Sequence, residues 1–160
     1  MNLNINIIDY IMFPFLLFIL LLIAINMKEG YINFPFLKRK KHKNIFNEDI
    51  EICSLDPLTG WHRNGKCTTD DFDYGTHTVC SKMTQEFLDY TKSKGNNLSD
   101  PKGSFPGLKP GDHWCLCSLR WLEAKKEGKA PPIKLKATHE KTLKDISFNK
   151  LISHNQKEIS

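Results

Sequence analysis

Hydrophobic positions form one long run near the amino terminus and shorter, interrupted patterns elsewhere. Ile11 to Ile25 contains no charged side chain, and with Asn26 and Met27 the run reaches seventeen residues. That length is at the short end of the roughly 17 to 25 residues that cross a bilayer. No basic stretch precedes the run and no cleavage site of small residues follows it, as they would in a signal peptide. The pattern therefore predicts a transmembrane anchor over residues 1–27.

The remaining chain mixes strand and helix patterns. Residues 75–83 alternate as in a strand. Thr84 follows as a helix cap and Gly95 ends that helix. A second helix is predicted over residues 118–127, which are rich in helix formers and precede Gly128.

Shorter patterns fill the intervals. Asn64-Gly65 between two short extended runs predicts a hairpin. Residues 50–53 and 133–137 are expected to be strands, the second at a sheet edge with its lysines outward. With two short helices at the carboxyl end, the fold class is a single small mixed α+β domain over residues 45–160, with three to four helices.

Positive charge is concentrated between the anchor and the domain. Residues 28–43 carry six Lys or Arg against one Glu, a net charge of +5, which equals the formal charge of the whole protein. Residues 28–44 are therefore predicted to be a basic juxtamembrane linker that contacts lipid headgroups. Because basic flanks stay on the cytoplasmic side, we expect a single-pass membrane protein whose domain faces the cytoplasm. The domain itself has no basic excess, which argues against nucleic acid as a partner.

The densest patch of unusual residues is FPGLKPGDHWCLCSLRW, residues 105–121. Two Pro-Gly turns precede Cys115 and Cys117. An extended backbone would place both sulfur atoms on one face. A helix capped by Asp112 would instead place Cys115 in its first turn, where the helix dipole favours a thiolate. We favour a helix that begins at or before Cys117, because helix formers follow it.

Five cysteines in a domain of this size need an explanation. In the cytoplasm they are expected to be reduced. In an oxidising compartment two disulfides and one spare thiol become possible, and the sequence does not decide the connectivity. The five are Cys53, Cys67, Cys80, Cys115 and Cys117.

Three uses of these cysteines compete. The first is a tetrahedral zinc site from Cys53, Cys67, Cys80 and either Cys115 or Cys117, with His77 as a substitute ligand, since thiolate and imidazole suit zinc. The second is nucleophilic catalysis with Cys115 or Cys80 as the thiolate and His77 or His139 as its base. With Cys115 and His77 assigned to catalysis, the assigned metal ligands are Cys53, Cys67, Cys80 and Cys117. The third is burial, because a free cysteine often behaves as a small hydrophobic residue.

Several consecutive blocks of the chain resemble a known family. They are CSLDPLTGWHRNGKC, GTHTVCSKMTQEFLDY, GNNLSDP, the residues 105–121 block and APPIKLKATHE. In this order they are similar to the uncharacterised bacterial family DUF2237 over about residues 52–154. The resemblance implies a domain and no activity, so it supplies no catalytic or binding residues. Asn64 and His113 stand where the family pattern leads us to expect Asp and Arg.

The function that these observations support is a hypothesis about one place in the domain. A Cys/His pocket is expected where the turn before Cys115 meets the Asn-Gly hairpin and the strand at Thr76 to Cys80. The pocket would bind a metal or support thiol-dependent hydrolysis, with Cys115 as nucleophile or ligand and His77 as base. The alternative is a non-catalytic binding module whose cysteines are structural.

Overall fold

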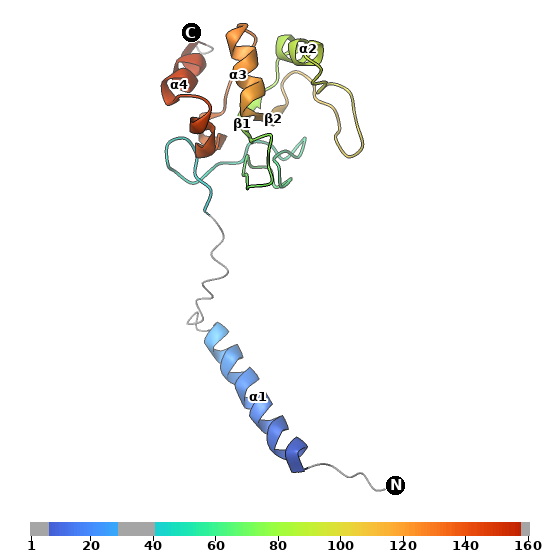
Figure 1. Ribbon diagram of the computed structural model, residues 1–160, viewed down its shortest axis with the longest axis vertical. Coiled ribbons are helices and arrows are strands. Elements are labelled where there is room, and N and C mark those ends of the chain that lie inside the picture. Colours follow the sequence, from blue (N-terminus) through green and yellow to red (C-terminus); the bar gives the residue numbers. More distant parts are fainter. Residues whose placement is uncertain (1–6, 29–40, 158–160) are drawn as a thin grey trace. The chain divides into compact units, whose positions relative to one another are not determined.

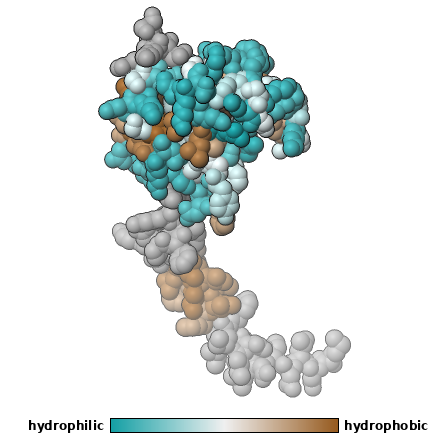
Figure 2. All heavy atoms as spheres, turned by 45° about the horizontal axis from the view of Figure 1, so that its top comes forward, coloured by the Kyte–Doolittle hydropathy of each residue, from teal (hydrophilic) through white to brown (hydrophobic). Residues whose placement is uncertain are grey.

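The structure is a computed structural model that describes residues 7–28 and 41–157 (Figure 1). The chain divides into two units, residues 1–40 and residues 41–160. In the first unit, helix α1 runs over Ile7–Lys28 and contains Pro14. Between residues 14 and 24 its side chains are exposed and nearly all hydrophobic, as Figure 2 shows.

The predicted membrane anchor is not borne out. Among the residues that the structure describes, no helix combines the length and the apolar character that a bilayer crossing requires. The predictions of a transmembrane helix over residues 1–27, of a single-pass membrane location facing the cytoplasm and of the membrane as a partner are therefore wrong. Most of the predicted linker, residues 29–40, lies outside the described residues.

A two-stranded antiparallel sheet lies at the centre of the second unit. It is formed by β1 (His77–Lys82) and β2 (His113–Cys117), with Cys80 opposite Cys115 and His77 opposite Cys117. The register shifts between His77 and Val79, where β1 has an irregularity of the β-bulge type. The strand predicted over residues 75–83 is thus confirmed, and its pairing partner is the stretch that was expected to be helical.

Helices follow both strands directly. α2 (Gln85–Ser93) begins after Thr84, whose side chain accepts a hydrogen bond from the Phe87 amide at 3.2 Å. α3 (Ser118–Lys126) ends before Gly128, which has the positive φ that a helix stop of this kind requires. Near the carboxyl end come the 3₁₀ helices η2 (Leu135–Ala137) and η3 (Glu140–Lys144), and then α4 (Phe148–Lys157). The mixed α+β class of this domain agrees with the prediction.

The two faces of the sheet have different neighbours. The helices lie to one side of β1 and β2, and the irregular segment before β1 lies to the other (Figure 1). Val79 and Leu116 face a large apolar core with Phe87 and Trp121, all nearly inaccessible to solvent. On the opposite face, a smaller buried cluster contains Ile50, Cys53, Cys67, Cys80, Cys115 and Ala137. Four of the five cysteines therefore meet on one face of the sheet.

Three predicted elements do not form, namely the strands at residues 50–53 and 133–137 and the Asn-Gly hairpin. Residues 133–137 make one bridge, Ile133 to Ser81, and then turn into η2. Thr138 closes this turn, because its hydroxyl donates to the Lys134 carbonyl at 3.1 Å. Asn64-Gly65 is a turn without flanking strands, since the Gly65 carbonyl accepts hydrogen bonds from the amides of Cys53 and Ser54 instead.

Candidate functional site

Two disulfides attach the irregular segment to the sheet. Cys53 is bonded to Cys80 on β1 and Cys67 to Cys115 on β2, and Cys117 is a free thiol. The expectation of five reduced cysteines is wrong, and the alternative of two disulfides with one spare thiol is the arrangement found. The sequence left the connectivity open, because it depends on which residues of a coil without repeating structure reach the sheet.

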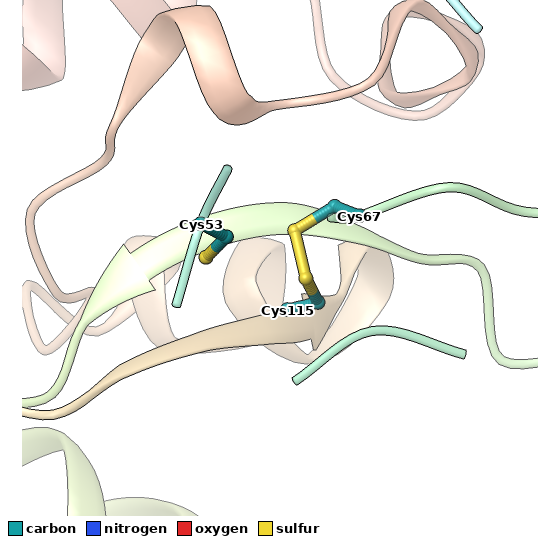
Figure 3. A group of neighbouring side chains, drawn as sticks. All are labelled: Cys53, Cys67 and Cys115. Carbon is teal, nitrogen blue, oxygen red and sulfur yellow. A yellow bond between two sulfur atoms is a disulfide. The ribbon is translucent and has the colours of Figure 1, made fainter. Parts of the chain in front are cut away.

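The two disulfides lie against each other. The sulfur atoms of Cys53, Cys67 and Cys115 are all within 4.8 Å of one another, and Figure 3 shows Cys53 beside the Cys67–Cys115 bond. All these side chains are buried. Because the sulfur atoms are paired with each other, they offer no thiolate to a metal in this form, and the zinc site is not supported here.

Cys117 is separate from this cluster. β2 stays extended through Cys117 and α3 begins only at Ser118, so the expectation of a helix starting at or before Cys117 is wrong. The chain turns into the helix at this point, and Cys117 lines a groove beside Tyr90 of α2 and Leu119 of α3. It therefore does not join the metal ligands to which the sequence assigned it.

A cavity of about 390 Å³ opens beside the second disulfide. It lies where the turn at residues 60–65, the start of β1, the loop at residues 97–105 and β2 meet. This is the place at which the sequence put a Cys/His pocket. Its walls are formed by Gly60, Trp61, Arg63, His77, Asn97, Leu98, Lys102, Phe105, Trp114 and Cys115.

His77 is held on three sides. Its Nδ1 lies 2.6 Å from Oδ1 of Asp73, a carboxylate that is itself buried. The indole of Trp61 stacks on the imidazole with the ring centres 5.9 Å apart and the planes 9° from parallel. A Cβ on Gly75 would come within 2.5 Å of the ring carbon Cε1, so only glycine leaves room for the ring there. No hydrogen bond to Nε2 is found within the described residues.

The Asp73 carboxylate is fully paired. Its Oδ2 accepts hydrogen bonds from the Thr69 hydroxyl at 2.8 Å and from the His77 backbone amide at 2.9 Å. A buried carboxylate needs such partners to offset its lost hydration. Asp73 therefore fixes both the backbone and the ring of His77.

The backbone just before His77 is strained. Thr76 has a φ of 47°, a left-handed conformation that a β-branched residue rarely adopts. Its carbonyl accepts hydrogen bonds from the amides of Thr78 and Ser118, which hold it there. Strain of this kind is typical of functional sites, where the surrounding structure imposes it.

Two cationic residues, Arg63 and Lys102, line the cavity together with its aromatic residues. The guanidinium carbon of Arg63 lies 4.9 Å from the ring centre of Trp114. Phe105 packs edge-on against the same indole, with the ring centres 5.3 Å apart. None of the lining residues is acidic. The nearby carboxylate of Asp100 is bound to Asn97 and Lys92. The lowered pKa of Asp100 follows from those two contacts, the Asn97 hydrogen bond first.

The structure thus brings His77 and Cys115 together at the cavity, with Cys115 in a disulfide and therefore without the thiolate that a nucleophile needs. His77 as a base and Cys115 as a nucleophile stay predictions. Sequence reasoning missed Trp61, Arg63 and Lys102, which carry no motif. It also did not single out Asp73, since the sequence does not show that this carboxylate contacts the His77 ring.

Comparison with models of protein families gives a match. A family model described as an uncharacterized protein conserved in bacteria (DUF2237) covers residues 43–155. No curated protein matches the chain significantly.

Proposed function

The chain belongs to the DUF2237 family of uncharacterised bacterial proteins, and we propose that its folded unit is a non-catalytic binding module with structural disulfides. Its cavity would take a small anionic ligand that has a flat apolar part. The observation that carries this proposal is the composition of the walls, in which two cations and a fixed histidine surround aromatic rings without any acidic side chain.

The size and the lining of the cavity suit a small molecule. Its volume of about 390 Å³ falls within the roughly 300 to 1,000 Å³ of typical ligand sites. Trp61, Phe105 and Trp114 offer aromatic surface, and Leu98 adds an aliphatic contact. A planar apolar group would pack against these rings, which prefer stacked or edge-on partners.

The charged groups select an anion. One guanidinium nitrogen of Arg63 donates a hydrogen bond to the Gly60 carbonyl at 3.3 Å. The guanidinium has five N–H donors in all, so others remain for a ligand. Lys102 makes no ion pair with the described residues and lies on the same cavity. Charge-assisted hydrogen bonds from such groups to a carboxylate or phosphate contribute about 1.5–3 kcal/mol each.

Intrinsic fluorescence tests the proposal directly, because two of the three tryptophans line the cavity and the third, Trp121, is fully buried in the core. Phenyl phosphate and benzoate should change the emission in a saturable way. Benzyl alcohol and benzylamine, which have the same ring without the negative charge, should bind at least about tenfold more weakly. Equal binding of all four compounds would contradict the proposal.

Matched variants assign the effect to the cavity. Lys102→Met removes one cation from the wall and should weaken phenyl phosphate binding about tenfold. Lys144→Met removes an exposed lysine of η3, outside the cavity lining, and should leave binding unchanged. Arg63→Lys keeps the charge but loses the planar donor fork, so it separates recognition by geometry from recognition by charge.

The contact between Asp73 and His77 favours a second candidate function, acid–base catalysis at His77. A carboxylate on Nδ1 orients the imidazole so that Nε2 can exchange a proton with a bound molecule. Incubation with chromogenic aryl esters and aryl phosphates tests this. Saturable hydrolysis that His77→Gln abolishes, while phenyl phosphate still binds, would favour an enzyme over a binding module.

A further inference from the structure

We propose that reduction of both disulfides converts the sulfur cluster into a four-thiolate site for a soft divalent metal ion such as Zn²⁺. The ligands are Cys53, Cys67, Cys80 and Cys115. The site shares Cys115 with the wall of the ligand cavity, but neither proposal requires the other.

The distances between the sulfur atoms carry the proposal. Those of Cys53, Cys67 and Cys115 lie within 4.8 Å of one another, and the Cys80 sulfur is bonded to that of Cys53. A tetrahedral zinc site with Zn–S bonds of about 2.3 Å places its sulfur atoms about 3.8 Å apart. Opening the two bonds lets bonded sulfur atoms separate, and the unbonded sulfur atoms among Cys53, Cys67 and Cys115 need to approach by about 1 Å at most. The Cys80 sulfur is not part of this group of three and turns toward it once its bond to Cys53 opens. Rotation of cysteine side chains supplies movements of this size.

The backbone already holds the four residues around one point. Cys80 and Cys115 are directly opposite each other in the antiparallel sheet. The Cys53 amide is tied to the Gly65 carbonyl at 2.7 Å, two residues before Cys67. The sheet register therefore positions one pair of ligands, and this contact keeps the other two close in the coil.

The surroundings favour a closed site. The exposed fraction of the four cysteines does not exceed 6%, and Ile50 and Ala137 complete the buried cluster. Such burial leaves no position for water on a bound ion, as in structural zinc sites with four protein ligands.

The chemistry of the conversion balances with a two-electron reductant. Each disulfide takes up two electrons and two protons to give two thiols, so two equivalents of a phosphine are consumed and leave as phosphine oxide, with oxygen from water. The metal ion then binds four thiolates and releases their four protons. Reoxidation to the disulfides would expel the ion, which makes the site sensitive to redox conditions.

Cobalt titration of the full chain tests the proposal. The protein is reduced with a phosphine under anaerobic conditions. The phosphine is then removed and Co²⁺ is added. We expect one Co²⁺ per chain, with the thiolate-to-cobalt charge-transfer band and the intense visible bands of tetrahedral cobalt. Zn²⁺ should displace it. Failure to bind, or the weak visible bands of octahedral cobalt, would overturn the proposal.

Thiol alkylation with mass spectrometry identifies the ligands without any variant. All five cysteines should react in the reduced, metal-free chain, and Cys117 alone should react rapidly once the metal is bound. Rapid reaction of any of the four proposed ligands in the metal-bound chain, or protection of Cys117, would contradict the assignment.

Two variants complete the experiment. Cys117→Ser removes the one cysteine outside the cluster, so it should keep the cobalt spectrum of the unaltered chain. Cys80→Ser should weaken Co²⁺ binding by about a hundredfold or more, since even residues that only support metal ligands cost 10- to 100-fold when removed. An unchanged affinity in Cys80→Ser would also overturn the four-thiolate site.

Discussion

His77 shows how a few local constraints prepare a side chain for recognition. Its ring is bonded to Asp73, stacked on Trp61 and placed against Gly75, which leaves one imidazole edge on the cavity. A ring fixed in advance loses little conformational entropy when a ligand binds. Removing one of these constraints should therefore affect binding more than folding.

Gly75→Ala tests this at the point of closest approach. The new Cβ would lie 2.5 Å from Cε1 of His77, so the imidazole must move away from Asp73 and Trp61. We expect phenyl phosphate binding to weaken several-fold, by about 1 kcal/mol, since one positioned hydrogen bond is lost. Fluorescence titration measures the binding.

Gly95→Ala is the matched control for the glycine substitution. Gly95 has a φ of 79° and no neighbouring atom within 4 Å of an added Cβ. Alanine there should lower the free energy of unfolding by about 1 kcal/mol through backbone strain and leave ligand binding unchanged. The opposite pattern, with binding affected only at Gly95, would contradict the role given to Gly75.

His113 should make the stability of the folded unit depend on pH. Burial lowers its pKa below the ordinary 6.5, and the nearby cations Lys134 and Lys82 lower it further, against a smaller opposing effect of Asp112. The unfolded chain then takes up a proton at a higher pH than the folded one. The contribution of neutral His113 to the free energy of unfolding is complete above pH 6.5. It is lost as the pH falls through 6.5 towards the lower folded-state pKa.

Urea unfolding of the natural chain and of His113→Gln at several pH values measures this effect. The advantage of the natural chain should shrink as the pH is lowered through 6.5, because glutamine does not titrate. A difference in unfolding free energy that grows on acidification would show that the His113 pKa is raised instead.

At the residue scale, sequence reasoning selected residues whose type alone limits their role. His77 and Cys115 were selected because imidazole and sulfur carry chemistry, and both lie on the cavity. Arg63 was missed because its position over Trp114 depends on contacts between distant segments. Asp73 was not singled out, because the sequence does not reveal that its carboxylate is buried.

The irregular segment before β1 behaves as an element that depends on its cross-links. Within residues 41–76 the structure has neither a regular helix nor a strand beyond isolated bridges. The Cys53–Cys80 and Cys67–Cys115 disulfides attach it to the sheet. They join cysteines that are 27 and 48 positions apart in the sequence, and so close loops of these lengths. In the loop-entropy model such cross-links stabilise a fold by about 3.5 and 4 kcal/mol, respectively.

Paired substitutions of each disulfide test this dependence. Cys53→Ala with Cys80→Ala, and Cys67→Ala with Cys115→Ala, should each lower the free energy of unfolding by about 2–4 kcal/mol, with the larger loss for the longer loop. Because small domains have about 5–15 kcal/mol in total, either variant should remain folded. Denaturant titration gives the values.

Hydrogen exchange locates the effect of these substitutions. Amides between residues 50 and 68 should exchange faster in both variants, while those of α2 should change much less. Uniform acceleration over the whole domain would show that the disulfides stabilise a single cooperative unit and that the segment is not separately dependent on them.

Predictions for single elements succeeded where the signal was local. Thr84 caps α2 and Gly128 follows the last turn of α3, because caps are formed by residues next to the helix they end. The extended form of Cys115 to Cys117 was missed, because it results from pairing with β1. Disulfide connectivity was likewise beyond local signals.

At the scale of the whole molecule, the sequence and the structure differ in where the folded unit begins. Sequence reasoning began the domain at Ile45, whereas the compact unit of the structure begins at Lys41. Asn44 explains the difference, because its fully buried side chain accepts hydrogen bonds from the amides of Phe46 and Glu48 and donates one to the Lys136 carbonyl at 3.1 Å. We therefore propose that the domain includes residues 41–44, which the sequence assigned to a charged linker.

Two fragments test this boundary. The fragment of residues 45–160 lacks the Asn44 side chain and should have a free energy of unfolding roughly 2–4 kcal/mol below that of residues 41–160, since three backbone groups lose their partner at about 1 kcal/mol or more each. Asn44→Ala in the longer fragment should reproduce most of this loss. Lys41→Ala should change little, because the Lys41 to Asp49 contact is exposed and such pairs contribute at most about 1 kcal/mol. Equal stability of the two fragments would instead place the start of the domain at or beyond Ile45.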